Sequence, residues 1–101
     1  MHRKRTDTNH HAIAATFEKH GFRVRSTADL GDGFPDMVIA RHGVGNVLIE
    51  AKDRKGHNGG RLNDRQALFH DTWPGPVFIV YSEQEADELA KCLRARREWN
   101  P

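Results

Sequence analysis

Three charged side chains beside two short apolar runs are the residues of this sequence best suited to chemistry. Asp36 comes directly before one run, Glu50 directly follows the other, and Lys52 lies two residues beyond Glu50. A polar, glycine-rich segment joins the two runs, which predicts a β-hairpin. Antiparallel pairing folded about Gly43 sets Asp36 opposite Glu50, and Lys52 then leaves the same face of its strand. We therefore expect two carboxylates and a lysine to converge at one end of the hairpin.

These residue types suit metal-dependent hydrolysis of a phosphodiester. Two neighbouring carboxylates ionise together only with a compensating cation. Mg²⁺ resolves that conflict, because it takes one or two carboxylates together with water and substrate oxygens. The backbone carbonyl of Ala51 is a further candidate ligand. Lys52, beside the metal, would contact a phosphate and orient a water, where negative charge accumulates in the transition state.

A simpler interpretation is a surface salt bridge between Glu50 and Lys52, with Asp36 as a turn residue. The tripeptide Glu-x-Lys is common and alone favours this alternative. The preceding Gly-x-Pro-Asp of residues 33–36 and the apolar strands on both sides favour the site.

The surrounding pattern predicts one α/β domain over residues 8–97, with a central mixed sheet flanked by helices. Residues 1–7 are expected to be a flexible basic N-terminus. The continuously apolar strand at residues 77–81 is expected to be buried on both faces. The predicted order is αβββαβα: a helix from Thr8 (capped by Thr8 or Asp7) to Gly21, strands at 22–26, 37–40 and 47–49, a helix from Asn63 to Trp73, a strand at 77–81, and an amphipathic helix from a capping box of Ser82 and Glu85.

Composition sets the scale of the domain and points to polyanions as partners. The chain has 101 residues, of which 37% are hydrophobic and 30% charged, so the core must be small. Basic blocks at residues 2–5, 52–61 and 94–97 suit phosphate contacts, although a solvated surface also explains each block. A single cysteine and the lack of any signal-peptide or transmembrane stretch lead us to expect a soluble cytoplasmic protein with no membrane partner.

The motifs together resemble a known nuclease family. Gly33-Phe34-Pro35-Asp36, then Glu50-Ala51-Lys52, Gly56, and Leu62-Asn63-Asp64-Arg65-Gln66 are similar to the PD-(D/E)XK nucleases, and more narrowly to the stand-alone VRR-NUC branch of phages and bacteria. The similarity extends from about residue 9 to residue 86. It implies a restriction-endonuclease-like core and a DNA endonuclease dependent on Mg²⁺ or Mn²⁺. Asp36 and Glu50 would be its metal ligands and Lys52 its catalytic lysine.

Two further site residues follow from the resemblance, each with a structural alternative. Gln66 matches the family's glutamine on the helix near the active site, but it also stands where it can close a capping box with Asn63. Glu18 is the candidate for an acid that the family's first helix often directs at the metal. The alternative for Glu18 is a solvent-exposed helix acid.

The expected substrate is branched or otherwise structured DNA. Stand-alone members of the family resemble Holliday-junction resolvases and often act as homodimers. Arg54, Lys55 and Arg61 are candidate DNA-phosphate contacts, or members of a solvated loop. Two other functions stay open: a non-catalytic nucleic-acid-binding module of the same fold, and a sequence-specific restriction-type endonuclease. Bacterial or phage-infected cytoplasm is the expected location.

Overall fold

The computed structural model describes residues 9–101, apart from the side chains of His57 and Asn58. The expected N-terminal cap at Asp7 or Thr8 and the basic segment 1–7 lie outside this range. Without the two 3₁₀ turns, the order of the elements is αβββαβα, as expected. The elements are α1 (His10–Lys19), β1 (Arg23–Ser26), η1 (Ala28–Leu30), β2 (Met37–Arg41), β3 (Gly45–Ala51), η2 (His57–Gly60), α2 (Asp64–Thr72), β4 (Val77–Val80) and α3 (Glu83–Ala95).

The four strands form one mixed sheet in the order β1-β2-β3-β4. β1, β2 and β3 are antiparallel, whereas β4 pairs in parallel with β3. In the hairpin, Met37 lies opposite Ile49 and Ala40 opposite Asn46, so the pairing folds about Gly43 as predicted. Gly43 has a φ of 85°, a conformation that glycine adopts without strain at the turn.

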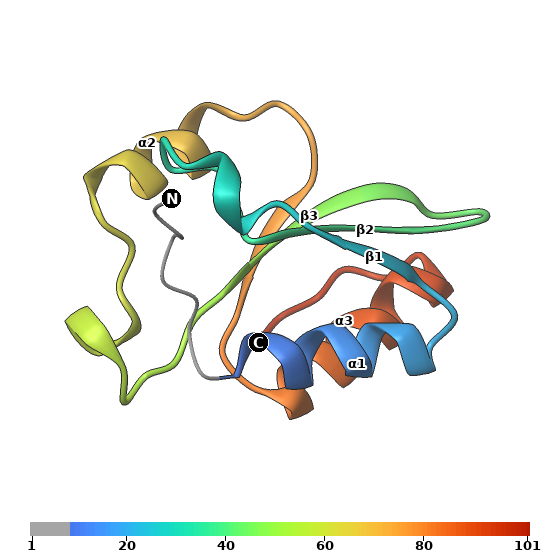
Figure 1. Cartoon of the computed structure of the whole chain (residues 1–101). Helices are drawn as coiled ribbons and strands as arrows, with labels where there is room; N and C mark the ends of the chain where they lie inside the picture. Colours follow the sequence, from blue (N-terminus) through green and yellow to red (C-terminus); the bar gives the residue numbers. More distant parts are fainter. Residues whose placement is uncertain (1–8) are drawn as a thin grey trace.

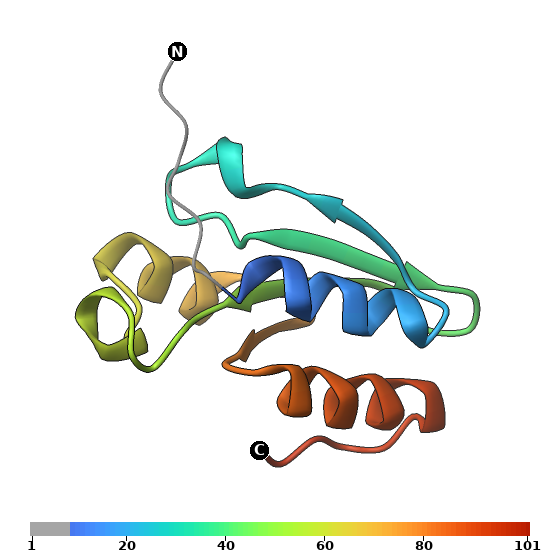
Figure 2. The same ribbon diagram turned by 60° about the horizontal axis from the view of Figure 1, so that its bottom comes forward.

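One face of the sheet carries the hydrophobic core. α1 and α3 lie side by side against this face (Figures 1 and 2). Alternate residues of β2 and β3 point into it, beginning with Met37 and Ile49, which are fully buried. The core cluster comprises Ile13, Phe17, Phe22, Met37, Ile39, Val47, Ile49, Ala51, Val80, Ala86, Leu89 and Ala90.

Local capping defines the starts of α2 and α3. Asn63 and Gln66 form the expected reciprocal capping box at α2. At α3, the Ser82 hydroxyl accepts from the Glu85 N–H, but the Glu85 carboxylate accepts from the N–H of Tyr81 rather than that of Ser82. The expected Ser82–Glu85 capping box is therefore only half formed. None of the helices in residues 9–101 has the length and apolarity needed to cross a membrane.

The expectation that β4 is buried on both faces is wrong. β4 is an edge strand, paired with β3 on one side. Val77, Phe78 and Ile79 are half-buried, and within the strand Val80 alone is fully buried. The apolar composition reflects packing on the core, where Val80 is buried and Phe78 packs against the core cluster, rather than a central position in the sheet.

Candidate active site

Asp36 is held at the entrance to β2 by bonds to its backbone. The Thr27 N–H donates to the Asp36 carbonyl at 2.7 Å, and the Thr27 hydroxyl donates to the Pro35 carbonyl at 2.7 Å. The carboxylate is buried, and its Oδ2 accepts from the Ala51 N–H at 2.8 Å. This bond crosses from β2 to β3 and fixes the acid against the end of the neighbouring strand.

Glu50 lies beside Asp36, as the hairpin register predicts. The pairing of Met37 with Ile49 continues by one residue to set Asp36 opposite Glu50, and directly opposed side chains share a face of the sheet. That face is opposite to the core, because Met37 and Ile49 point into the core. Glu50 is 1% exposed and Asp36 4% exposed. Two acids of adjacent strands are thus withdrawn from bulk water at one end of the hairpin.

Gln66 closes the expected capping box of α2 and also contacts Glu50. Its side-chain oxygen accepts from the Asn63 N–H at 3.0 Å, closing the capping box of α2. Its amide Nε2 lies 3.5 Å from Glu50 Oε2. Since one amide has both an acceptor and donors, the cap orients the side chain and leaves the NH₂ group facing the acid.

Lys52 leaves the same face as Glu50, two residues along the chain, and its side chain is half-buried. Its backbone is held on two sides. The Lys52 N–H donates to the Val80 carbonyl at 3.0 Å, and Asn9 Nδ2 donates to the carbonyls of Lys52 at 2.7 Å and Tyr81 at 2.9 Å. Asn9 therefore ties the start of α1 to the ends of β3 and β4. The sequence did not single it out, because these contacts span much of the chain.

His70 is a second residue of the site that the sequence did not single out. Its Nε2 lies 3.8 Å from Glu50 Oε1 and, among the described residues, makes no hydrogen bond. Burial lowers the pKa of His70 below its ordinary value, and the charge of Lys52 lowers it further, while Asp36 acts in the opposite direction. The imidazole is therefore mainly neutral at pH 7, so its contact with Glu50 is polar rather than an ion pair. The available signal was its spacing of four residues from Gln66, which places both on one face of α2.

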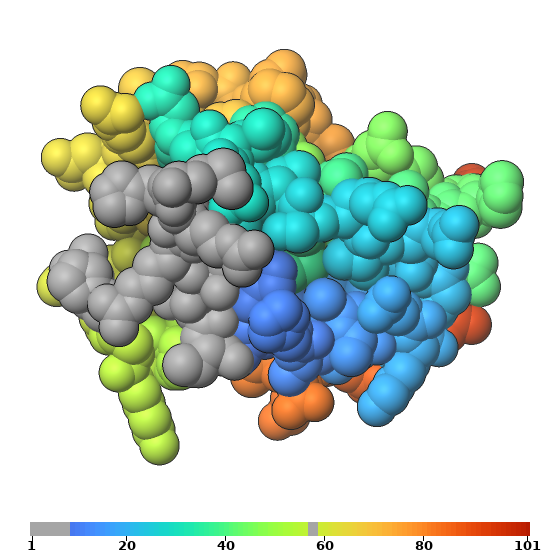
Figure 3. All heavy atoms as spheres, in the orientation of Figure 1, coloured from blue at the N-terminus to red at the C-terminus, as the bar shows by residue number. Residues whose placement is uncertain are grey.

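A close backbone contact brings α2 to the acids. A Cβ on Gly33 would lie 2.3 Å from the Arg65 carbonyl oxygen, so the loop before Asp36 touches the first turn of α2 directly. The two segments lie against each other in Figure 3. The rings of Phe34 and Phe69 pack edge-on, with 5.1 Å between their centroids. The close contact with α2 therefore explains why the first position of the Gly-x-Pro-Asp motif is glycine in this chain.

Glu18 is not brought to this cluster. It is exposed near the C-terminal end of α1, whereas Asn9, at the other end of that helix, reaches the site. Glu18 lines a separate hollow with residues of β1, including Arg23 and Arg25. The structure thus favours the alternative of a solvent-exposed helix acid.

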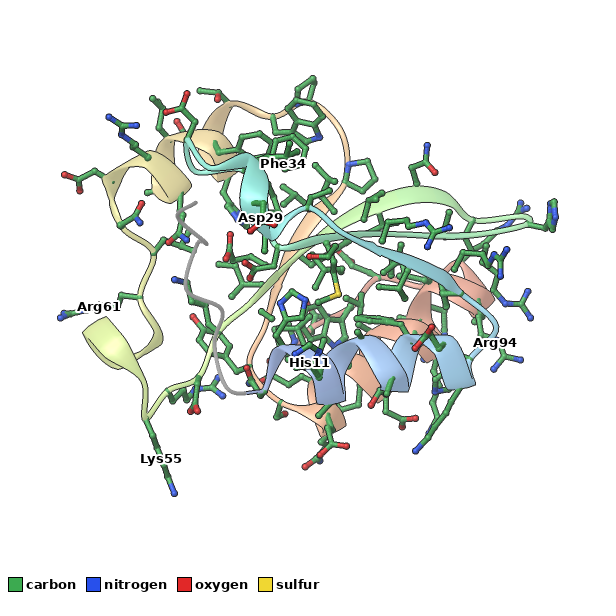
Figure 4. All side chains as sticks on the ribbon, in the orientation of Figure 1. His11, Asp29, Phe34, Lys55, Arg61 and Arg94 are labelled. Carbon is green, nitrogen blue, oxygen red and sulfur yellow. The ribbon has the colours of Figure 1, made fainter. Side chains whose placement is uncertain are left out.

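The three candidate DNA contacts of the loop after Lys52 have different surroundings. Arg54 lies over the Tyr81 ring at 4.0 Å and pairs with Glu85 at 3.3 Å, so much of its charge is compensated. Lys55 and Arg61 extend outward from the loop between β3 and α2 (Figure 4). The Arg54 side chain is nevertheless 63% exposed, which agrees with the solvated-loop alternative.

The donor set fits a divalent ion that keeps part of its hydration shell. Asp36 and Glu50 offer oxygen ligands side by side, and the unbonded Nε2 of His70 faces the same acid. Within residues 9–101, no group of three or more His, Cys, Asp or Glu side chains is arranged so that it could hold a metal ion. Mg²⁺ suits the arrangement, since it typically uses one or two carboxylates and several waters. The Ala51 carbonyl stays a predicted further ligand.

No protein-family model, curated protein or solved structure matches this chain.

Proposed function

We propose that the protein is a Mg²⁺- or Mn²⁺-dependent DNA endonuclease with a restriction-endonuclease-like core. The observation that carries this proposal is the pair of buried acids, Asp36 and Glu50, opposed at one end of a hairpin with Lys52 on the same face. A surface salt bridge does not account for two acids that are almost fully withdrawn from water. Burying charged carboxylates is costly unless a cation accompanies them.

Each residue of the cluster has a role in this proposal. Asp36 and Glu50, with the Ala51 carbonyl, would hold the ion, which activates the phosphate and a water molecule when bound. Lys52 contacts the scissile phosphate and orients the attacking water. Water attacks phosphorus and the bond to the 3′ oxygen breaks, leaving a 5′-phosphate and a 3′-hydroxyl. Gln66 keeps Glu50 in position through its amide, which the capping box of α2 orients.

The proposed substrate is branched DNA, such as a Holliday junction, cut by a homodimer. A domain of 101 residues has little surface for reading a long base sequence, so recognition of backbone shape is favoured. A four-way junction offers two equivalent strands, which a two-fold dimer matches. Arg54, Lys55 and Arg61 remain proposed contacts to DNA phosphates, with Arg54 the weakest of them.

A cleavage assay on linear, flapped, single-stranded and four-way DNA tests the proposal. With Mg²⁺ or Mn²⁺ the protein is expected to nick branched DNA, and EDTA is expected to stop it. Lys52→Ala should lower the cleavage rate by about a hundredfold or more while DNA binding is retained. Lys19→Ala is the matched control, because Lys19 is an exposed lysine in the last turn of α1, away from the site, and this variant should cut like the wild type.

Two outcomes would overturn this function. Cleavage by the Lys52→Ala protein at the wild-type rate would remove the mechanism. Salt-dependent DNA binding without cleavage, and without metal binding in calorimetry, would instead identify a non-catalytic binding module. Mapping the cuts on a plasmid and on a four-way junction separates a structure-selective enzyme from a restriction-type enzyme.

A further inference from the structure

β1 carries two arginines on the same face of the sheet as the acids. Arg25 lies opposite Val38 and Arg23 opposite Ala40 in the antiparallel pair of β1 and β2. Directly opposed residues share a face, and Val38 lies two residues from Asp36 along the chain. Arg23, Arg25 and Asp36 therefore leave the sheet on one side, while Val24 between the arginines packs against the core on the other side.

This face is open beyond the acids. α1 and α3 cover the opposite face, and α2 lies over the end that carries Glu50 (Figure 1). Arg23 and Arg25 are exposed, and Val38 and Ala40 of β2 beside them are half-buried. A shallow apolar surface beside two guanidinium groups suits the sugar and phosphate groups of a nucleic-acid backbone.

The two arginines are uncommitted within the described part of the chain. Neither side chain makes a hydrogen bond or ion pair with the described residues, whereas the side chain of Arg41 donates to the His20 carbonyl, that of Arg65 pairs with Asp32, and that of Arg94 contacts His20. Glu18 lines the same hollow, of about 380 Å³, as Arg23 and Arg25, but it lies beyond ion-pair distance of both. Both guanidinium groups are thus available for an anion from outside the chain.

On the open face, Arg25 lies nearer to Asp36 and Arg23 lies farther from it, at intervals of similar length. Residues i and i+2 of a strand lie about 7 Å apart, and diagonal neighbours on adjacent strands about 7–8 Å. Asp36, Arg25 and Arg23 thus follow one another along the open face. Arg23 also borders a second hollow, of about 630 Å³, at the hairpin turn, so the face is not blocked beyond it.

We propose that Arg23 and Arg25 bind consecutive phosphates of the DNA strand beside the scissile phosphate and so set where on the strand the cut falls. This inference rests on the proposed nuclease function. It names a second contact surface, on β1, which is separate from the loop of Arg54, Lys55 and Arg61. Arginine suits the role, since its planar fork binds phosphate through two parallel hydrogen bonds.

DNA binding measured by fluorescence anisotropy in the Lys52→Ala background, with EDTA, tests the inference independently of cleavage. The double change Arg23→Gln with Arg25→Gln should weaken binding by about tenfold to a hundredfold at 0.1 M salt and lower the salt slope by about 1.8, which is about 0.9 for each lost phosphate contact. The matched control is Lys91→Gln with Arg94→Gln, which removes two positive charges from α3 on the covered side of the sheet. The control should keep most of the wild-type slope.

A neutral methylphosphonate at each phosphate flanking the cut gives the position of the contact. It should weaken binding of the parent protein at one or two positions and have no effect there on the protein that carries both Arg23→Gln and Arg25→Gln. The inference fails, while the nuclease proposal stands, if the parent binds DNA and the variant with Arg23→Gln and Arg25→Gln binds with the same affinity and salt slope as the control with Lys91→Gln and Arg94→Gln. If the parent binds no DNA, the nuclease proposal itself fails. Competition by polyglutamate as strong as that by DNA of equal charge would reassign the surface to an acidic protein.

Discussion

Protonation of His70 opposes folding, because the imidazole is partly buried and lies near the charge of Lys52. Its native pKa is lowered, first by burial and then by the charge of Lys52. Between this lowered pKa and the ordinary value of 6.5, the unfolded chain binds a proton that the native protein does not. The free energy of unfolding therefore falls as the pH drops below about 6.5, and this contribution stops changing below the native pKa.

For the metal-free protein, we predict that His70→Gln removes this loss of stability. Urea unfolding in EDTA between pH 5 and 7.5 should show that the variant loses less free energy of unfolding on acidification than the wild type. His11→Gln, at an exposed position on α1, is the control and should behave like the wild type. An equal acid-induced loss in the wild type and the His70→Gln protein would contradict the burial of a neutral imidazole.

At the scale of elements, the site depends on how α2 meets the loop before β2. Gly33 has a φ of 81°, and its Cα faces the Arg65 carbonyl with no room for a side chain. Gly31, in the same loop, has a φ of 72° but nothing within 4 Å of the position of a Cβ. Comparing substitutions at the two glycines therefore distinguishes the cost of an unusual backbone conformation from the cost of displacing α2.

We predict that Gly33→Ala is clearly more harmful than Gly31→Ala. In both variants, an alanine in this backbone conformation lowers the free energy of unfolding by about 1–3 kcal/mol. Gly33→Ala must in addition move α2 away from the loop, which withdraws Gln66 and His70 from Glu50. Urea unfolding gives the stability difference, and calorimetric titration with Mn²⁺ is expected to show weaker metal binding for Gly33→Ala alone. Equal behaviour of the two variants would show that Gly33 does not seat α2.

At the scale of the whole molecule, one face of the sheet carries the hydrophobic core and the other face carries the candidate site. α1 and α3 pack on one face, where their apolar side chains and those of the strands form the core, whereas the acids, Lys52 and the arginines of β1 leave the other face. A change in the helical layer should therefore alter stability with little effect on the site. This division also leaves one broad face of a small domain open for a large ligand.

We predict that Leu89→Ala lowers the free energy of unfolding by about 2–5 kcal/mol, because Leu89 is fully buried and its loss leaves a cavity. Leu68→Ala, at a position 64% exposed on α2, should change it by about 0.5 kcal/mol or less. Below its melting temperature, the Leu89→Ala protein should bind Mn²⁺ as tightly as the wild type. Weakened metal binding in the folded variant would show that the two faces are coupled.

The sequence by itself determined the local features of this protein. The hairpin register about Gly43, the capping of α2 by Asn63, and the common face of Asp36, Glu50 and Lys52 all follow from short spacings and from the alternation of side chains along a strand. Such features depend on neighbours in the chain, so a single sequence is enough to predict them.

Only the tertiary structure decided which distant residues meet the acids. The approach of His70 to Glu50, the bond from Asn9 to the Lys52 carbonyl, and the distance of Glu18 from the site depend on how helices pack on the sheet. The edge position of β4 depends in the same way on strand order, which its apolar composition does not encode. Packing is a property of the whole chain, and many arrangements are compatible with one local pattern.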